Sequence, residues 1–210
     1  SRVSRGLGDV YKRQEYFSEM TDIALTYGAT IDKYIGDAMM VFFGDPESKG
    51  EREDARACIK MALNMQRKIK SLQSKWRNEG FYEPFQIRMG INTGYCNVGN
   101  FGSEQRLTYT IIGGEVNIAQ RLEAAAPSDG ILMSFESYAH VQDLVEVEEL
   151  SSITMKGINR EIKVFSVISD LKSNKVTKDK NEVSSIKSKG NSLELRIDTV
   201  SYTHLTLPTT

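Results

Sequence analysis

The segment 31–44 reads IDKYIGDAMMVFFG and sets Asp32, Lys33 and Asp37 among apolar residues that ought to be buried. Asp37 follows Gly36 in what we interpret as a tight turn between two strands, where the missing side chain lets a ligand approach the backbone. A carboxylate at such a turn can hold a hard cation such as Mg²⁺ together with substrate phosphates. Gly-Asp is also frequent in hairpin turns that bind nothing. We interpret Asp32 as a solvated charge at the strand edge.

A second polar group lies in the segment 108–123, TYTIIGGEVNIAQRLE. Asn117 and Arg121 are four residues apart, so they share one face of a predicted helix. An amide and a guanidinium on one face can hydrogen-bond a sugar oxygen and a phosphate, although a lone pair of this kind is more often a surface pair. The Gly-Gly-Glu run suggests a diguanylate cyclase, but Val116 follows it where that family has an acidic residue, which excludes the interpretation.

Hydrophobic periodicity predicts the elements that must position these groups. Apolar residues recur at helical spacing in some stretches and alternate at strand spacing in others, with glycines and prolines between them. The pattern predicts helices over 16–27, 55–69 and 116–126, strands over 30–35, 38–43, 85–91, 131–134 and 161–168, and a glycine-punctuated hairpin within 94–102. This order indicates an α/β (α+β) fold, a ferredoxin-like sandwich with helices packed on a mainly antiparallel sheet.

Composition excludes several classes of protein. The 210 residues are 40% hydrophobic, enough for a core, and the net charge of −1 argues against a nucleic-acid or anionic-membrane binder. Two cysteines are too few for a disulfide scaffold and suit a reducing compartment. No apolar run approaches the roughly 20 residues of a membrane-spanning helix. We therefore expect a soluble, cytoplasmic segment with no nucleic-acid partner and no direct membrane contact of its own.

The two ends differ from the middle. Residues 1–14 lack a sustained helical or strand period, and residues 201–210 read SYTHLTLPTT. Both resemble translated adapter sequence, so we expect a non-native leader and a non-native tail and leave them out of fold reasoning. Residues 169–200 begin with a stretch rich in Lys, Ser, Asp and Asn, which predicts a polar linker. The domain itself is expected to span 15–168.

Three motifs stand in register within that span: DKYIGDAMMVFFGDP, then IRMGINTGYCNVGNFGSEQRLTYTIIGGEVNIAQRLEAAAP, then TMKGINREIKVFSV. Together they resemble the catalytic domain of class III adenylate/guanylate cyclases, with the same order and similar gaps. The bacterial type with threonine in place of the adenine-reading aspartate is the nearest pattern. The resemblance implies that Asp37 is one of two metal-binding aspartates. It further implies that Lys33 and Thr110 read the purine.

The resemblance assigns the remaining groups to the sugar and phosphates. Asn117 matches the residue that orients the ribose, Arg121 the one that stabilises the transition-state phosphate, and Lys156 a lysine that contacts the terminal phosphates. The implied reaction is attack of the 3′-hydroxyl of ATP on its own α-phosphate, giving cyclic AMP and pyrophosphate with two Mg²⁺ or Mn²⁺ ions per site. In this family the site is shared between two protomers, which predicts a homodimer.

One departure from the family pattern concerns the first metal aspartate. The family places it in an F-x-D-[IV]-x-G-F strand ahead of the first helix, and no such motif is present. Asp9 lacks the flanking Phe and Gly-Phe, so we reject it as a substitute. We therefore expect the first strand to be missing and the chain by itself to be inactive. A non-catalytic cyclase-homology module that regulates an active partner, and a guanylate cyclase, are the alternatives.

Overall fold

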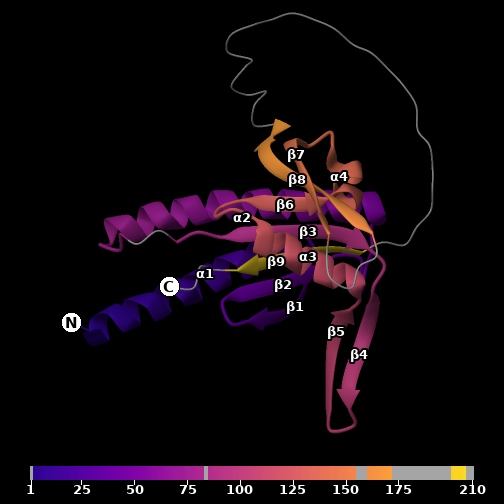
Figure 1. Cartoon of the computed structure of the whole chain (residues 1–210). Coiled ribbons are helices and arrows are strands. Elements are labelled where there is room, and N and C mark those ends of the chain that lie inside the picture. The colour runs from indigo at the N-terminus through magenta and orange to yellow at the C-terminus, as the bar shows by residue number, and fades with distance from the viewer. Residues whose placement is uncertain (1, 83–84, 155–159, 172–199, 207–210) are drawn as a thin grey trace, which may run out of the picture.

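The protein is described by a computed structural model that covers residues 2–82, 85–154, 160–171 and 200–206, with only the backbone described for 2–9, 153–154 and 200–206. Figure 1 shows one central sheet with helices on both faces and a two-stranded hairpin that extends from it. The helices are α1 (Arg2–Thr26), α2 (Glu51–Asn78), α3 (Gly114–Ala125) and α4 (Phe135–Val141). The strands are β1 (Thr30–Ile35), β2 (Ala38–Phe42), β3 (Arg88–Gly94), β4 (Asn97–Ser103), β5 (Arg106–Ile112), β6 (Ile131–Ser134), β7 (Val145–Thr154), β8 (Glu161–Asp170) and β9 (Val200–Thr206).

Within the part of the chain that the structure describes, the main sheet has seven strands in the order β1-β2-β9-β3-β6-β8-β7. Of these described pairs, β3–β6 is parallel and the others are antiparallel. The expectation of a mainly antiparallel sheet with helices packed on it is therefore confirmed. Strand β7 is an element that the sequence analysis did not predict, although its segment VEVEELSSIT begins with the alternation of apolar and acidic residues that is typical of a strand.

Strand β2 lies in the core because both of its faces are covered. Met39, Val41 and Phe43 belong to the large cluster formed with α1 and α2, while Met40 and Phe42 pack with residues of β5 and α3 on the opposite face. All five residues of β2 are buried. The period-two alternation of a strand thus divides one continuous apolar run between two separate cores.

The place between β2 and β3 is filled by β9. This strand pairs antiparallel with both neighbours, from Met39↔Leu205 to Phe42↔Tyr202 on one side and from Arg88↔Thr206 to Gly94↔Val200 on the other. A ferredoxin-like sheet places its first strand at this position. The expectation that residues 201–210 lie outside the fold therefore differs from the structure for 201–206. The edges of β2 and β3 that a missing first strand would leave open are paired with β9.

Helix α1 begins at Arg2, so residues 2–14 continue the predicted first helix instead of forming a separate irregular leader. The helix is anchored to α2 through Glu15, which accepts hydrogen bonds from the indole of Trp76 at 2.8 Å and from Lys75. Tyr16, Met20 and Ala24 point into the large core. By packing against α2, helix α1 fixes the position of the turn that leads into β1. The first candidate site residues lie on β1.

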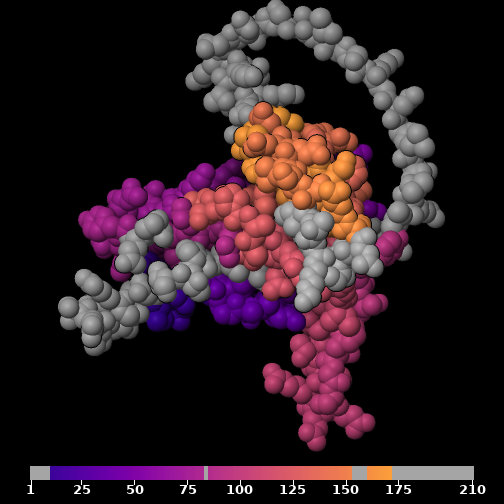
Figure 2. All heavy atoms as spheres, in the orientation of Figure 1, coloured from indigo at the N-terminus to yellow at the C-terminus, as the bar shows by residue number. Residues whose placement is uncertain are grey.

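Strands β4 and β5 form a hairpin separate from the main sheet, in register from Asn97↔Ile112 to Ser103↔Arg106. The space-filling view shows it as an arm that projects from the body (Figure 2). Its outer part is solvent-exposed, including the large side chains Phe101, Leu107 and Tyr109. A hairpin is present in this region, but it extends beyond the expected 94–102 span, because its turn lies at 104–105 and its second strand follows that turn. Among the described residues, no helix is long and apolar enough to span a membrane.

Candidate active site

The turn between β1 and β2 consists of Gly36 and Asp37, since Ile35 and Ala38 form the last residue pair of the ladder. Gly36 has φ +63°, a left-handed conformation that suits glycine at the first position of a two-residue hairpin turn. Asp37 is half-buried at the end of the sheet. The turn predicted from the sequence is therefore confirmed.

Lys33 and Thr110 are brought together from positions 77 residues apart in the chain. The Lys33 Nζ donates a hydrogen bond of 2.9 Å to Thr110 Oγ1. Thr110 is buried, whereas 43% of the Lys33 side chain is exposed. A charged donor and a hydroxyl therefore meet at one point, with the donor still reachable from solvent.

The interpretation of Asp32 as a solvated charge is wrong, because its side chain is fully buried. A β-bulge causes this burial. The register passes from Ile31↔Val41 directly to Lys33↔Met40, which leaves Asp32 as an extra residue without a partner on β2. Sequence periodicity gives no signal of a bulge, so the side chain was assigned to the wrong environment.

The carboxylate of Asp32 contacts both the backbone of β5 and the side chain of Lys33. Its Oδ1 accepts a hydrogen bond of 3.1 Å from the backbone N–H of Ile111 on β5. Its Oδ2 lies 3.1 Å from Lys33 Nζ, an ion-pair contact that lacks the alignment of a hydrogen bond, and it accepts no hydrogen bond from the described residues. The hydroxyl of Tyr109 donates to Asp45 Oδ1, and this bond raises the pKa of the Tyr109 phenol. Three successive residues of β5 are thus tied to β1 and to the loop after β2.

Helix α3 carries Asn117 and Arg121 on its exposed side, as their spacing predicted. Its inner side, formed by Ile118, Ala119 and Leu122, is buried. The helix approaches β3 very closely at Gly90, where a Cβ atom would lie 2.1 Å from the carbonyl oxygen of Ala119. Only glycine fits at that point, so β3 fixes the height of α3 above the sheet.

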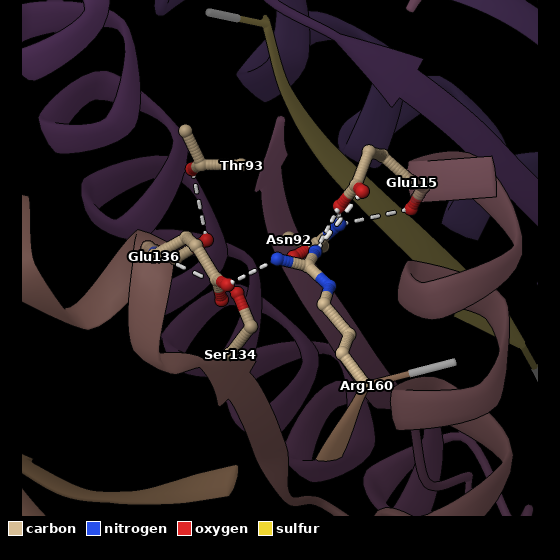
Figure 3. A network of polar contacts seen from close by, with 7 residues as sticks. Asn92, Thr93, Glu115, Ser134, Glu136 and Arg160 are labelled. Atoms are coloured by element: carbon tan, nitrogen blue, oxygen red, sulfur yellow. Dashed lines mark hydrogen bonds and ion pairs between the residues drawn. The ribbon is translucent and has the colours of Figure 1, made fainter. Parts of the chain in front are cut away.

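A polar network fixes the first turn of α3 (Figure 3). The buried Asn92 of β3 donates from Nδ2 to the backbone oxygen of Glu115 at 3.0 Å and to its Oε2 at 2.8 Å. Arg160, the residue just before β8, reaches the same carboxylate with Nη2 at 3.0 and 2.9 Å from the two oxygens, and its Nη1 donates to Glu136 at 2.8 Å. Sequence reasoning missed these residues, whose role depends on contacts between distant segments.

The other predicted site residues do not all enter this arrangement. Lys156 lies outside the described residues. Among the described side chains, no group of three or more His, Cys, Asp or Glu is placed to hold a metal ion. Asp37 fits the kind of single carboxylate that binds Mg²⁺ together with substrate phosphates. The neighbouring strand β9 has the sequence VSYTHLT, which contains no second carboxylate.

A phenol lies in the core, close enough to the Gly36–Asp37 turn for the charge of Asp37 to act on it. The Tyr16 hydroxyl is buried and has no hydrogen-bond partner among the described residues. Burial raises the pKa of this phenol far above its usual value, and the negative charge of Asp37 adds to the increase. The phenol is therefore neutral at any physiological pH and contributes no charge to the site.

Residues 10–169 match the family model described as "Adenylate and Guanylate cyclase catalytic domain". Adenylate cyclase 1 of Rhizobium meliloti is 30% identical over 156 residues, which cover 73% of this chain and 23% of that protein. An adenylate cyclase of Anabaena cylindrica is 29% identical, over 67% of this chain and 28% of its own length. The chain thus spans about a quarter of the length of these curated relatives.

Solved structures agree with the family match. The adenylyl cyclase CyaB from P. aeruginosa is 46% identical with a TM-score of 0.73, covering 76% of this chain and 82% of that one. The guanylyl cyclase Cya2 is 30% identical with a TM-score of 0.71, covering 77% and 81%. The match extends over the turn at Asp37, the Lys33–Thr110 contact and the polar face of α3, and on this evidence the chain belongs to the adenylate and guanylate cyclase catalytic domain family.

Proposed function

We propose that this chain is the catalytic domain of an adenylate cyclase that converts ATP into 3′,5′-cyclic AMP and pyrophosphate in the cytoplasm. The observation that carries the choice of ATP is the hydrogen bond of 2.9 Å between Lys33 Nζ and Thr110 Oγ1. It unites two side chains that the sequence resemblance assigns to the purine.

The pair suits adenine because of its hydrogen-bonding groups. Adenine presents a ring nitrogen that accepts and an exocyclic amine that donates, whereas guanine presents a carbonyl and a protonated ring nitrogen at the same edge. The Lys33 ammonium has three donors and no acceptor, so it complements the accepting nitrogen. Thr110 accepts from Lys33 and retains a second lone pair for the amine. Of the two side chains, Lys33 is the more decisive, since a hydroxyl can also donate.

The polar face of α3 suits the sugar and the phosphates. Asn117 would hold the ribose so that its 3′-hydroxyl oxygen faces the α-phosphorus, and Arg121 would neutralise charge that develops on the phosphate oxygens. Lys156 would bind the terminal phosphates. The new bond forms between the 3′-oxygen and the α-phosphorus, the bond to the β-phosphate oxygen breaks, pyrophosphate leaves, and the hydroxyl proton is released.

Asp37 is the described residue that would hold Mg²⁺ or Mn²⁺. Such ions, two per site in the complete domain, supply Lewis-acid stabilisation of charge on the phosphate oxygens. The strand between β2 and β3 would have to contribute the second carboxylate, and here that strand is β9, which contains none. We therefore propose that the 210-residue chain by itself is inactive. A completed domain, in which a strand with the F-x-D-[IV]-x-G-F motif occupies this place, would be active.

The proposed site is shared between two copies of the domain. In support, the β4–β5 arm extends from the body and exposes several large apolar side chains that a second copy would cover (Figure 2). Tyr34 and Ile35 at the end of β1 are exposed as well. In this arrangement one protomer contributes Asp37, and its partner contributes the groups that contact the base, ribose and phosphates.

The test uses two inactive variants of the completed domain. Asp37→Asn keeps the turn but removes the metal-binding charge, and Asn117→Ala removes the ribose contact. Each is expected to lower cyclic AMP formation by about a hundredfold or more. A mixture should regain activity, because one of the two sites in a heterodimer has every group intact. Absence of recovery in demonstrated heterodimers would argue against the shared site. Near-normal turnover of Asp37→Asn would mean that Asp37 is a turn residue and does not bind the metal.

A non-catalytic regulatory module is the second candidate, and the lack of a carboxylate in β9 favours it. One measurement distinguishes the regulatory module from an active adenylate cyclase. A completed domain that forms dimers but produces no cyclic nucleotide with Mg²⁺ or Mn²⁺ would support the regulatory module. Cyclic GMP as the main product from equal ATP and GTP would instead indicate a guanylate cyclase, the activity named for Cya2.

A further inference from the structure

We propose that Asp32 is a positioning residue that determines base preference by holding Lys33 against Thr110. This inference rests on the proposed function, because it assigns a partner to the pair that would read the purine. The side chain of Asp32 is fully buried, so it acts through Lys33 and not by touching the nucleotide.

The two carboxylate oxygens of Asp32 have separate contacts. Oδ1 accepts from the backbone N–H of Ile111 at 3.1 Å, which fixes β5 against β1. Oδ2 lies 3.1 Å from Lys33 Nζ and has no hydrogen bond from the described residues. One side chain therefore sets the distance between the strand that carries Lys33 and the strand that carries Thr110, and it also places a negative charge beside the ammonium.

Lysine needs such a restraint more than most residues do. Its long side chain has several rotatable bonds, and ordering it costs up to about 2 kcal/mol of conformational entropy. The Lys33 side chain is 43% exposed, so without an attractive partner its ammonium would sample water. A buried carboxylate next to it, together with the Thr110 hydroxyl, orders the ammonium before a nucleotide binds.

The bulge in β1 makes this arrangement possible. In regular pairing, successive residues point to opposite faces, so Asp32 and Lys33 would point apart. The irregularity between Ile31 and Lys33 lets the side chains of neighbouring residues meet instead. Tyr109 adds a further restraint on the far side of Thr110 through its bond to Asp45, so β5 has little freedom to move away.

The informative variant is Asp32→Asn. An amide oxygen still accepts from the Ile111 N–H, but the amide nitrogen then faces the Lys33 ammonium, a donor against a donor. Asp32→Asn therefore keeps the hydrogen bond from the Ile111 N–H but removes the ion pair that orders the Lys33 side chain. Competition against a fluorescent ATP analogue on the 210-residue chain should give a ratio of GTP to ATP dissociation constants about tenfold smaller than in the unaltered chain. Asp22→Asn, the same chemical change at an exposed position of α1, is the matched control and should leave the ratio unchanged.

The possible outcomes distinguish failure of the Asp32 inference from failure of the proposed function. A ratio that is unchanged in Asp32→Asn while the unaltered chain prefers ATP would overturn the inference alone. An unaltered chain that binds neither nucleotide would contradict the proposed base-reading role of Lys33 and Thr110 and would overturn the inference with it. In a Lys33→Met background the Asp32→Asn change should have no further effect on the ratio, and an equal effect in both backgrounds would show that Asp32 does not act through Lys33.

A measurement without any variant covers the case in which Asp32→Asn does not fold. The Ile111 amide is expected to exchange slowly with solvent, because its acceptor is a buried carboxylate. Exchange at the rate of an exposed amide would mean that Asp32 does not hold β5, and the proposal would fail.

Discussion

Replacing Gly90 with alanine tests how closely α3 must approach the sheet. A Cβ atom at this position would lie 2.1 Å from the carbonyl oxygen of Ala119 and 2.2 Å from the backbone nitrogen of Glu123. Carbon atoms settle at about 3.5 Å or more from such neighbours, and the contacts are backbone atoms that cannot rotate away. Helix α3 would therefore have to move by roughly 1 Å or more from β3.

The expected loss of stability follows from two opposing effects. Overpacking of a tight core costs about 1–3 kcal/mol, and the unyielding backbone places this site near the upper end. Replacing glycine inside a strand returns about 0.5–1 kcal/mol of conformational entropy. We expect the free energy of unfolding to fall by about 2 kcal/mol, measured by urea denaturation followed by circular dichroism.

The matched control is Gly114→Ala, at the first residue of α3. A Cβ atom there would have no heavy atom within 4 Å, and the change should raise stability by about 0.5–1 kcal/mol. In the completed domain, Gly90→Ala should also lower turnover, because the displacement of α3 from β3 moves Asn117 away from its position. A Gly90→Ala chain as stable as the unaltered one would refute the close contact between α3 and β3.

Three further predictions concern single groups. Tyr16→Phe removes a buried hydroxyl without a described partner, so thermal unfolding should show a gain of about 1 kcal/mol, and a loss of similar size would reveal an unseen partner. The Arg56 hydrogen bond lowers the pKa of Asp143, so the stabilisation is present above the ordinary carboxyl pKa and is lost as pH falls through the lowered pKa. Asp143→Asn should therefore cost less than about 1 kcal/mol at pH 7, with the difference disappearing in acid when denaturation is repeated across pH. Lys33→Glu combined with Thr110→Cys should shrink the preference of the completed domain for ATP over GTP, and an unchanged product ratio would remove these side chains from base recognition.

The sequence alone determined much of the fold, because its signals are local. Apolar alternation and the Gly-Asp pair gave the β1–β2 hairpin to within a residue, and the helical stripe gave the centre of α2. The i, i+4 spacing placed Asn117 and Arg121 on one exposed face of α3. The resemblance of three ordered motifs anticipated the family, which the family model and solved structures confirm.

Tertiary structure decided what depends on pairing between distant segments. The bulge that buries Asp32 arises from the register of β1 on β2, which no local pattern encodes. The place of β9 between β2 and β3 depends on two open strand edges and not on its own composition, which is why residues 201–206 appeared unrelated to the fold. The Lys33–Thr110 contact likewise exists only because β5 lies beside β1. Since β5 belongs to a hairpin separate from the main sheet, this hydrogen bond across 77 residues of sequence requires that hairpin to dock against β1.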